Sequence, residues 1–330
     1  MSNPVVVEVL RGGRVESAHR GAGAVVDADG RVLLAFGDVE RPIYPRSAVK
    51  ALQALPLIEG GAADKLALTE IEIALACASH SGEASHVALA TAMLGKAGRD
   101  AGSLECGAQW PLGEKAARAL ARMGQTPSAL HNNCSGKHAG FVCFASAEGI
   151  DPTGYVSPNH PVQRAVTRAL AEVTGVRLCD ETPAIDGCSI PAFAIPLRAL
   201  AHGFARFATG RGLDPLLARA AMRIRAAVAA HPWAVAGEGR FDTEVMTLLG
   251  PRAFTKAGAE GVFCAALPEL GLGLAVKADD GAKRAAEVMI AALIRRFGGF
   301  GEALDPFAAP PLINWNGIAV GGLRPAGPLG

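Results

Sequence analysis

Charged residues are scarce in this chain: they make up 19% of its 330 residues, whereas hydrophobic residues make up 50%. A chain with so much apolar material buries a large core, which excludes an intrinsically disordered protein. The charges also nearly cancel, at a formal net charge of +1. No cluster of Lys and Arg is interleaved with aromatic residues, so we expect no nucleic-acid partner.

Long apolar runs and export features are missing as well. No segment approaches the roughly 18 consecutive apolar residues that a membrane span needs. The first residues carry no basic segment ahead of a hydrophobic one, so we expect neither a signal peptide nor a membrane partner. The seven cysteines lack the dense spacing of a secreted disulfide scaffold. We therefore expect reduced thiols and a cytoplasmic location.

Nucleotide-binding loops are incomplete in this sequence. Gly136-Lys137 lacks both the earlier glycine and the following Ser or Thr of a phosphate loop, and Gly271-Leu272-Gly273 lacks the third glycine of a dinucleotide fingerprint. ATP and NAD therefore have no support as ligands.

Strand-like segments lie toward both ends of the chain, and helical patterns lie mostly between them. A hairpin is predicted around the Asp29-Gly30 turn, and further strands are predicted over 261–266 and 271–276. Helical patterns recur near 47–55, 70–78, 84–96, 114–124, 137–148, 160–173, 195–207, 214–230 and 281–297. We predict a single α+β domain over 1–330, in which the ends, about 1–45 and 255–330, build one antiparallel sheet and a helical region of about 46–254 is inserted. The Gly- and Pro-rich tail from Gly321 is predicted to be loose.

Ser47 and Lys50 form a Ser-x-x-Lys motif, which is the most informative feature that is present. On a helix the two residues share a face, and a lysine with a lowered pKa can take the proton of a serine nucleophile. Burial and the positive end of the helix dipole would both lower that pKa. The alternative is an N-cap serine followed by a surface lysine.

Two further motifs could contribute to the same chemistry. The segment 78–86 concentrates hydroxyls and imidazoles at a predicted turn, where a helix-capping role for Ser81 or Ser85 is the alternative. Lys256-Ala257-Gly258 precedes a predicted strand and partly matches the late Lys-Thr-Gly signature of penicillin-binding proteins and class A β-lactamases. The middle threonine and a Ser-Asp-Asn triplet are missing, so the match is incomplete.

Cys134 and Cys188 could belong to a metal site. Two thiols with an imidazole or an amine can hold a tetrahedral zinc ion, and spacing alone favours His138 as the nitrogen ligand beside Cys134. The alternative is that both cysteines are merely buried, because cysteine is among the most buried residue types.

Taken together, these motifs resemble the Rhizobium-type (class 3) L-asparaginases, which are also catalogued as the asparaginase II family. The segments that carry the resemblance are 44–50, 78–83, 131–140, 160–163, 186–191 and 256–263. They occur in order over nearly the whole chain, and the run His-Asn-Asn-Cys-Ser-Gly-Lys-His from His131 is very specific.

The resemblance implies a serine β-lactamase-like fold and the hydrolysis of L-asparagine to L-aspartate and ammonia through an acyl-enzyme. It implies a homodimer and two catalytic Ser–Lys pairs, Ser47 with Lys50 and Ser79 with Lys256. It also implies a zinc ion (Zn2+) as cofactor, with the ligands Cys134, Lys137 and Cys188.

Other residues are candidates for holding the substrate. Asp186 is the candidate partner of the substrate α-ammonium, and the further candidates are Arg46, His80 and Asn133. Three rival functions stay open: a zinc-dependent amidase using metal-bound water, a β-lactam-binding or glutaminase-type acyl-transfer enzyme, and a non-catalytic amino-acid-binding protein. The sequence also leaves open which Ser–Lys pair attacks and whether zinc is catalytic or structural.

Overall fold

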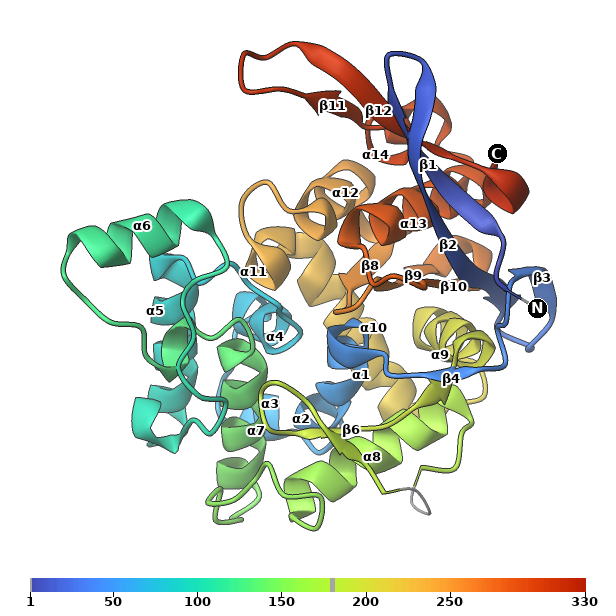
Figure 1. Cartoon of the computed structure of the whole chain (residues 1–330). Coiled ribbons are helices and arrows are strands. Elements are labelled where there is room, and N and C mark those ends of the chain that lie inside the picture. Colours follow the sequence, from blue (N-terminus) through green and yellow to red (C-terminus); the bar gives the residue numbers. More distant parts are fainter. Residues whose placement is uncertain (1, 179–181) are drawn as a thin grey trace. The chain divides into compact units, whose positions relative to one another are not determined.

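The computed structural model of the chain describes residues 2–178 and 182–330 (Figure 1). They form two compact units. The sheet unit comprises Met1–Ala48, Ala194–Arg211 and Arg252–Gly330, and the helical unit comprises Val49–Phe193 and Gly212–Pro251. The single domain over 1–330 stays a prediction. In the described part of the chain, every helix is too short or too polar to cross a membrane.

An eight-stranded antiparallel sheet forms the centre of the sheet unit. Its order is β11 (Pro311–Ile313), β12 (Ala319–Pro325), β1 (Val5–Arg11), β2 (Arg14–Asp27), β10 (Leu272–Ala278), β9 (Val262–Leu267) and β8 (Phe254–Ala257), and β3 (Val32–Phe36) pairs with β2. The prediction of one antiparallel sheet from both chain ends is therefore confirmed. A short ladder between β4 (Pro42–Ile43) and β7 (Ile195–Pro196) lies in the same unit.

The predicted hairpin at Asp29-Gly30 is present between β2 and β3. Asp27 Oδ1 accepts hydrogen bonds from the backbone N–H groups of Asp29 and Arg31, at 3.0 and 2.9 Å. Gly30 has φ of 88°, a conformation that glycine adopts without steric cost. The local residues therefore determine this turn.

The prediction of a loose tail from Gly321 is wrong. Residues Ala319–Pro325 form β12, which pairs with β1 on one side and β11 on the other. A Cβ atom on Gly321 would lie 1.9 Å from the carbonyl oxygen of Leu10. The glycine that resembled a flexible linker is needed because two strands approach closely there.

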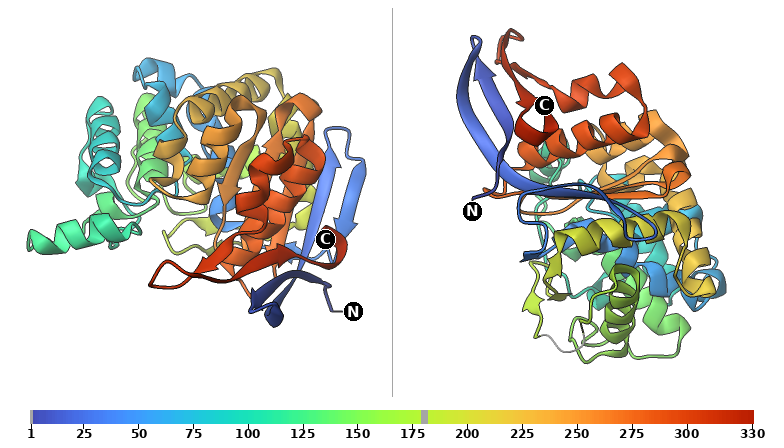
Figure 2. Two further views of the ribbon diagram at one scale, coloured as in Figure 1. Left: turned by 90° about the horizontal axis from the view of Figure 1, so that it is seen from above. Right: turned by 90° about the vertical axis from the view of Figure 1, so that its right-hand side faces the viewer.

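Two long helices cover opposite faces of the sheet (Figure 2). They are α9 (Leu197–Thr209) and α13 (Lys283–Gly298). A Cβ atom on Gly273 of β10 would lie 2.0 Å from Ala201 O of α9, so the missing side chain lets this helix approach the strand. The sheet unit therefore has a three-layer arrangement in which strand β9, between β10 and β8, is buried throughout. Helix α14 (Asp305–Ala308) completes this unit.

The helical unit contains the other helices and a two-stranded ladder. Its elements are α1 (Lys50–Gln53), α2 (Leu55–Glu59), α3 (Ala62–Lys65), α4 (Glu70–Ala76), α5 (Ala84–Lys96), α6 (Glu114–Arg122), α7 (Ser135–Ala147), α8 (Pro161–Thr174), β5 (Ala184–Ile185), β6 (Pro191–Ala192), α10 (Pro215–Ala230), α11 (Pro232–Ala236) and α12 (Phe241–Leu249). These bounds confirm the helical patterns predicted between residues 70 and 173.

Helices α4 and α7 pack closely and place two of the sequence motifs side by side. A Cβ atom on Gly136 would lie 2.4 Å from Leu75 O, so only glycine fits there. Helix α4 begins at a capping box, in which Thr69 N–H donates to Glu72 Oε2 at 2.7 Å. The motif that starts at His131 thereby lies against the segment that follows α4.

Candidate active site

Lys50 and Ser79 form the centre of a buried polar cluster in the helical unit. Lys50 is 1% exposed, which excludes the alternative of a surface lysine. Its Nζ atom donates hydrogen bonds to Ala78 O at 2.6 Å and to Ser79 Oγ at 2.9 Å. The chain brings these residues together because Lys50 opens α1 and Ser79 follows the end of α4.

Burial lowers the pKa of Lys50 below its ordinary value of 10.5. The charge of Lys137 lowers it further, whereas the thiols of Cys134 and Cys188 oppose the shift. Desolvation dominates because an ammonium loses its hydration when it is buried. The direction is the one that a lysine general base needs.

Ser47 does not cap the helix that carries Lys50, so the alternative of an N-cap serine is wrong for this helix. The predicted single helix over 47–55 is divided into a 3-10 helix (Arg46–Val49), α1 and α2. The N-cap of α1 is Val49, which makes no side-chain capping bond. With only four residues, α1 is also too short for a helix dipole to account for the pKa of Lys50.

Cys134, Lys137 and Cys188 lie together in the helical unit. Lys137 is 2% exposed, and its Nζ atom donates to Cys188 Sγ at 3.1 Å. Cys188 lies in the turn between β5 and β6, where Ser189 has φ of 74°. Hydrogen bonding with Cys188, followed by the charges of Lys50 and Lys137, holds the pKa of Cys134 well below its ordinary value. Burial lowers the pKa of Lys137. The thiols of Cys188 and Cys134 outweigh burial, so the pKa of Lys137 is raised above its ordinary value.

The two sulfur atoms suit a zinc ion, and Lys137 would complete the set once it lost the proton that its raised pKa retains. In the ranges 2–178 and 182–330 no group of three or more His, Cys, Asp or Glu side chains could hold a metal. A site here would therefore depend on the lysine as its third protein ligand. His138, which spacing favoured, instead pairs its Nδ1 with Tyr155 Oη at 2.7 Å.

The six cysteines that the structure describes are buried, and their sulfur atoms form no disulfide with one another. This agrees with the expectation of reduced thiols for those six. Cys179 is the seventh and lies outside the described residues.

Several substrate-binding candidates lie around the same cluster. Asn133 O accepts from His80 N–H at 3.2 Å, and Asn133 Oδ1 accepts from Cys134 Sγ at 3.2 Å. Asp186 is half-buried two residues before Cys188, in the same turn. Burial, and next the nearby His86 and Lys50, hold the pKa of His80 well below its ordinary value, so its imidazole is neutral.

Ser47, Arg46 and Lys256 belong to the sheet unit. Lys256 lies in β8, is fully buried, and donates from Nζ to Ala257 O at 2.8 Å. A Cβ atom on Gly258 would lie 2.7 Å from Pro45 O, so the segment after Lys256 runs directly beside the segment that leads to Ser47. Arg46 has φ of 51°, a strained conformation for a non-glycine residue that often marks functional sites.

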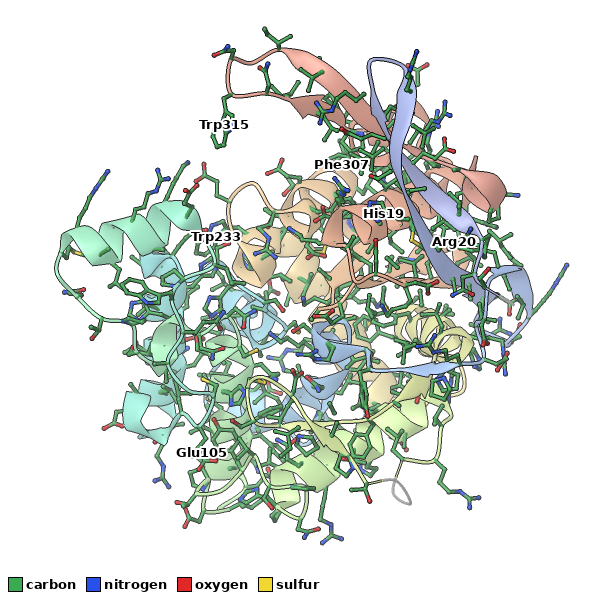
Figure 3. All side chains as sticks on the ribbon, viewed as in Figure 1. His19, Arg20, Glu105, Trp233, Phe307 and Trp315 are labelled. Atoms are coloured by element: carbon green, nitrogen blue, oxygen red, sulfur yellow. The ribbon has the colours of Figure 1, made fainter. Side chains whose placement is uncertain are left out.

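Sequence reasoning missed the contribution of α11. The backbone N–H of Ser79 donates to Val235 O at 2.9 Å, and Trp233 of the same helix is labelled in Figure 3. Helix α11 lies between the helical patterns predicted near 214–230 and 281–297, and it belongs to neither. A one-turn helix lacks the periodicity that would reveal it.

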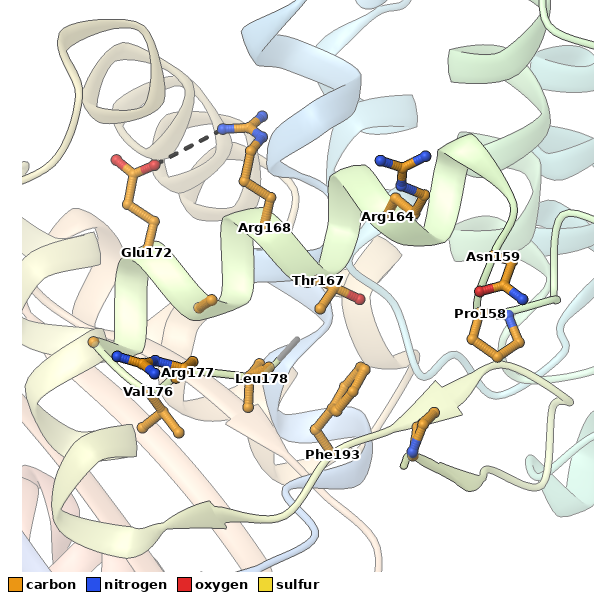
Figure 4. Close-up of a pocket in the computed structure, with 13 residues that line it drawn as sticks. Pro158, Asn159, Arg164, Thr167, Arg168, Glu172, Val176, Arg177, Leu178 and Phe193 are labelled. Atoms are coloured by element: carbon orange, nitrogen blue, oxygen red, sulfur yellow. Dashed lines mark ion pairs between the residues drawn. The ribbon is translucent and has the colours of Figure 1, made fainter. Parts of the chain in front are cut away.

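A separate cavity of about 860 Å³ lies along α8 in the helical unit (Figure 4). Phe193, Leu178 and Thr167 are among its lining residues, and the Arg168–Glu172 ion pair lies at its edge. None of the predicted site residues is among the described residues that line it.

Comparisons with known proteins identify relatives of the chain. The family model of L-asparaginase II matches residues 7–325, which confirms the resemblance predicted from the motifs. No curated protein matches at a significant level.

Solved structures with partial similarity include the protein Mglu, at 16% identity and a TM-score of 0.38, with 84% of this chain and 67% of that chain covered. A beta-lactamase from Mycobacterium bovis has 16% identity and a TM-score of 0.42, with 84% of this chain and 94% of that chain covered. Both similarities are low, and neither bears on the activity of this chain.

Proposed function

The chain belongs to the L-asparaginase II family, which indicates an amidohydrolase, and from this premise we propose that it hydrolyses L-asparagine to L-aspartate and ammonia. The observation that carries the proposal is the buried Lys50 amine, 2.9 Å from the Ser79 hydroxyl and with a lowered pKa. A neutral lysine beside a serine hydroxyl is the arrangement that Ser–Lys acyl transfer requires.

In this mechanism Lys50 is neutral and acts as the general base. Its two N–H groups donate hydrogen bonds to Ala78 O and Ser79 Oγ. Its lone pair accepts the Ser47 proton while Ser47 Oγ attacks the side-chain amide carbon of the substrate. Backbone N–H groups, among them that of Ser47, stabilise the oxyanion. The C–N bond breaks when Ser79, assisted by Lys256, passes its proton to the departing ammonia and receives the proton that Lys50 Nζ took from Ser47, so that Lys50 is neutral again. Water then attacks the aspartyl ester, which releases L-aspartate and restores the Ser47 hydroxyl.

Polar residues around the cluster are proposed to orient the substrate. The carboxylate of Asp186 is proposed to hold the substrate α-ammonium, and Arg46, His80 and Asn133 are proposed to hold its remaining polar groups. A neutral His80 adds no charge to the site, and it would have to give up its hydrogen bond with Gly82 or with Ser135 to bind the substrate through a ring nitrogen.

Zinc is part of the proposal as a bound ion held by Cys134, Lys137 and Cys188. When bound, it would supply a fixed positive charge that orients the substrate and braces the turn that carries Cys188. The serine already provides the nucleophile, so the residues above carry every step.

A coupled ammonia-release assay tests the activity, with L-asparagine and L-glutamine supplied side by side. We expect asparagine to be the better substrate. Binding of asparagine without release of ammonia would instead identify an amino-acid-binding protein, and faster turnover of glutamine would identify a glutaminase.

Single substitutions of the two serines assign their roles. If Ser47 attacks, Ser47→Ala abolishes the aspartyl ester that mass spectrometry detects on the peptide containing residue 47, whereas Ser79→Ala slows turnover but retains that ester. An ester on Ser79 would reverse the roles. Normal turnover by Ser47→Ala together with complete loss of activity on zinc removal would favour the metal-bound-water amidase.

Three properties complete the proposal. The two units are proposed to form a serine β-lactamase-like fold, which a crystal structure would test. A homodimer follows from the family resemblance, and light scattering in solution measures it. A cytoplasmic location follows from the expected reduced thiols, and cell fractionation tests it.

A further inference from the structure

The segment that carries Ser79 is held against α11 by hydrogen bonds to the end of that helix. Ser79 N–H donates to Val235 O at 2.9 Å, and Ser81 Oγ donates to Ala236 O at 2.8 Å. The last carbonyls of a helix have no partner within it. These two bonds therefore satisfy acceptors of α11 and fix the backbone on both sides of His80.

Glu83 connects the same two segments through its side chain. Its Oε2 accepts from Trp233 Nε1 at 3.1 Å, and its Oε1 accepts from the backbone N–H of Glu238 at 3.1 Å. A Cβ atom on Gly237 would lie 2.5 Å from Glu83 Oε1, and Gly237 has φ of 106°. The backbone at residue 237 thus leaves room for this carboxylate, and only glycine allows that approach.

A stack of three rings lies beside these hydrogen bonds. The rings of His80 and His86 are 4.8 Å apart at 10°, and those of His86 and Trp233 are 4.0 Å apart at 15°. Gly82 N–H donates to His80 Nδ1 at 3.1 Å, so His80 Nε2 carries the hydrogen and donates to Ser135 Oγ at 2.9 Å. The residue directly after Ser79 is therefore fixed both by ring stacking and by both of its ring nitrogens.

We propose that Glu83 and Trp233 are positioning residues that hold Ser79 Oγ within hydrogen-bond reach of Lys50 Nζ. The inference rests on the proposed function, because it assigns a task to Ser79 in the same reaction. Neither residue needs to touch the substrate. They act through the backbone of residues 79–83, so their loss displaces Ser79 relative to Lys50, and it alters substrate affinity only as far as it displaces His80.

Glu83→Ala is the direct test, because it removes both acceptors at once. A displacement of about 1 Å at reacting groups costs on the order of 100-fold in rate, so we expect kcat to fall by about that factor and KM to change much less than kcat. Glu83→Gln keeps one acceptor oxygen and should recover part of the lost kcat. Trp233→Phe keeps a ring in the stack but removes the N–H donor, and should give an intermediate kcat.

Glu238→Ala is the matched control. Within residues 2–178 and 182–330, the Glu238 side chain pairs with the exposed Lys115 Nζ at 3.1 Å, and its contribution to the Glu83 contact comes from its backbone N–H, which alanine retains. Its kcat and KM should equal those of the unmodified protein.

Hydrogen–deuterium exchange of the Ser79 amide gives a readout that does not depend on activity. That amide donates to Val235 O, so it should exchange faster in Glu83→Ala than in the unmodified protein or in Glu238→Ala. An unchanged exchange rate overturns the proposal, and so does faster exchange with unchanged kcat. A protein that exchanges as expected but releases no ammonia from asparagine would refute the proposed function and retain the positioning of Ser79.

Discussion

Lys50→Met is the substitution that most directly tests the proposed chemistry. Methionine keeps an unbranched apolar stem of similar length, so the packing around residue 50 is nearly retained while the amine is removed. General-base catalysis contributes about 100- to 10,000-fold. At about 1.4 kcal/mol for each factor of ten, the loss raises the activation free energy by about 3–5 kcal/mol.

The expected cost to stability is smaller than the cost to activity. Nζ of Lys50 donates to two groups, Ala78 O and Ser79 Oγ. Ala78 is fully buried, and a buried carbonyl left without its donor costs about 1–3 kcal/mol. Removal of a desolvated amine offsets part of that cost. A free energy of unfolding of about 5–15 kcal/mol leaves the variant folded, so lost turnover cannot be attributed to unfolding.

Lys96→Met provides the matched control within the same helical unit. Lys96 Nζ pairs with the buried carboxylate of Glu72 at 2.6 Å and donates to Ala67 O at 2.9 Å. This variant also loses two contacts of a lysine amine, so its melting temperature should fall at least as far as that of Lys50→Met. Ammonia release per folded molecule should remain normal for Lys96→Met and fall at least 100-fold for Lys50→Met, within the range above. Turnover by Lys50→Met within tenfold of the unmodified protein, or a comparable loss in Lys96→Met, would refute Lys50 as the base.

Three further predictions concern pH, metal and the sheet. Since burial lowers the folded-state pKa of Lys50 below 10.5 and the base must be neutral, kcat/KM should rise with pH along a limb centred below that value. Between the folded-state and the unfolded-state pKa of Lys50, the unfolded chain binds more protons, so the free energy of unfolding should also rise with pH in that interval. A kcat/KM limb centred at or above pH 10.5 would contradict the assignment of Lys50 as the base. Cys134→Ser should lower the zinc content measured by elemental analysis, whereas Cys143→Ser, whose thiol donates to Met93 O at 3.3 Å, should not; equal zinc in both removes Cys134 from the ligands. Gly321→Ala places a Cβ atom 1.9 Å from Leu10 O and should lower the free energy of unfolding in urea by about 1–3 kcal/mol; an unchanged midpoint would argue against the β1–β12 register.

Local sequence patterns predicted most of the helices and strands, but they did not predict the strand that the C-terminal tail forms. The turn at Asp29-Gly30 and the helices between residues 70 and 173 follow from turn chemistry and helical periodicity. The tail was mistaken for a loose end because glycine favours turns when it is considered alone. Whether a second backbone lies against Gly321 depends on β1, about 310 residues earlier in the chain.

The candidate site was predictable as a set of residues and only partly as an arrangement. The motifs pointed to Lys50, Cys134 and Cys188 as candidates, and the family resemblance added Ser79 and Lys137. Spacing favoured His138 as a zinc ligand, but the structure pairs His138 with Tyr155 and brings Lys137 to Cys188. Adjacent residues on a helix point in different directions. The segments that pack against α7 therefore determine whether Lys137 or His138 reaches the cluster.

The sequence alone determined the family, the antiparallel sheet from both chain ends and the residues able to carry Ser–Lys chemistry, because these depend on residue type and spacing. Tertiary structure alone decided that Lys50 is buried, that its amine lies beside Ser79, and that α11 and Glu83 hold the Ser79 segment. Desolvation lowers the pKa of Lys50, and desolvation depends on how densely distant segments pack around an amine. A Ser-x-x-Lys motif therefore specifies candidates for Ser–Lys chemistry, and the packing of α1, α4, α7 and α11 determines the surroundings of the Lys50 amine.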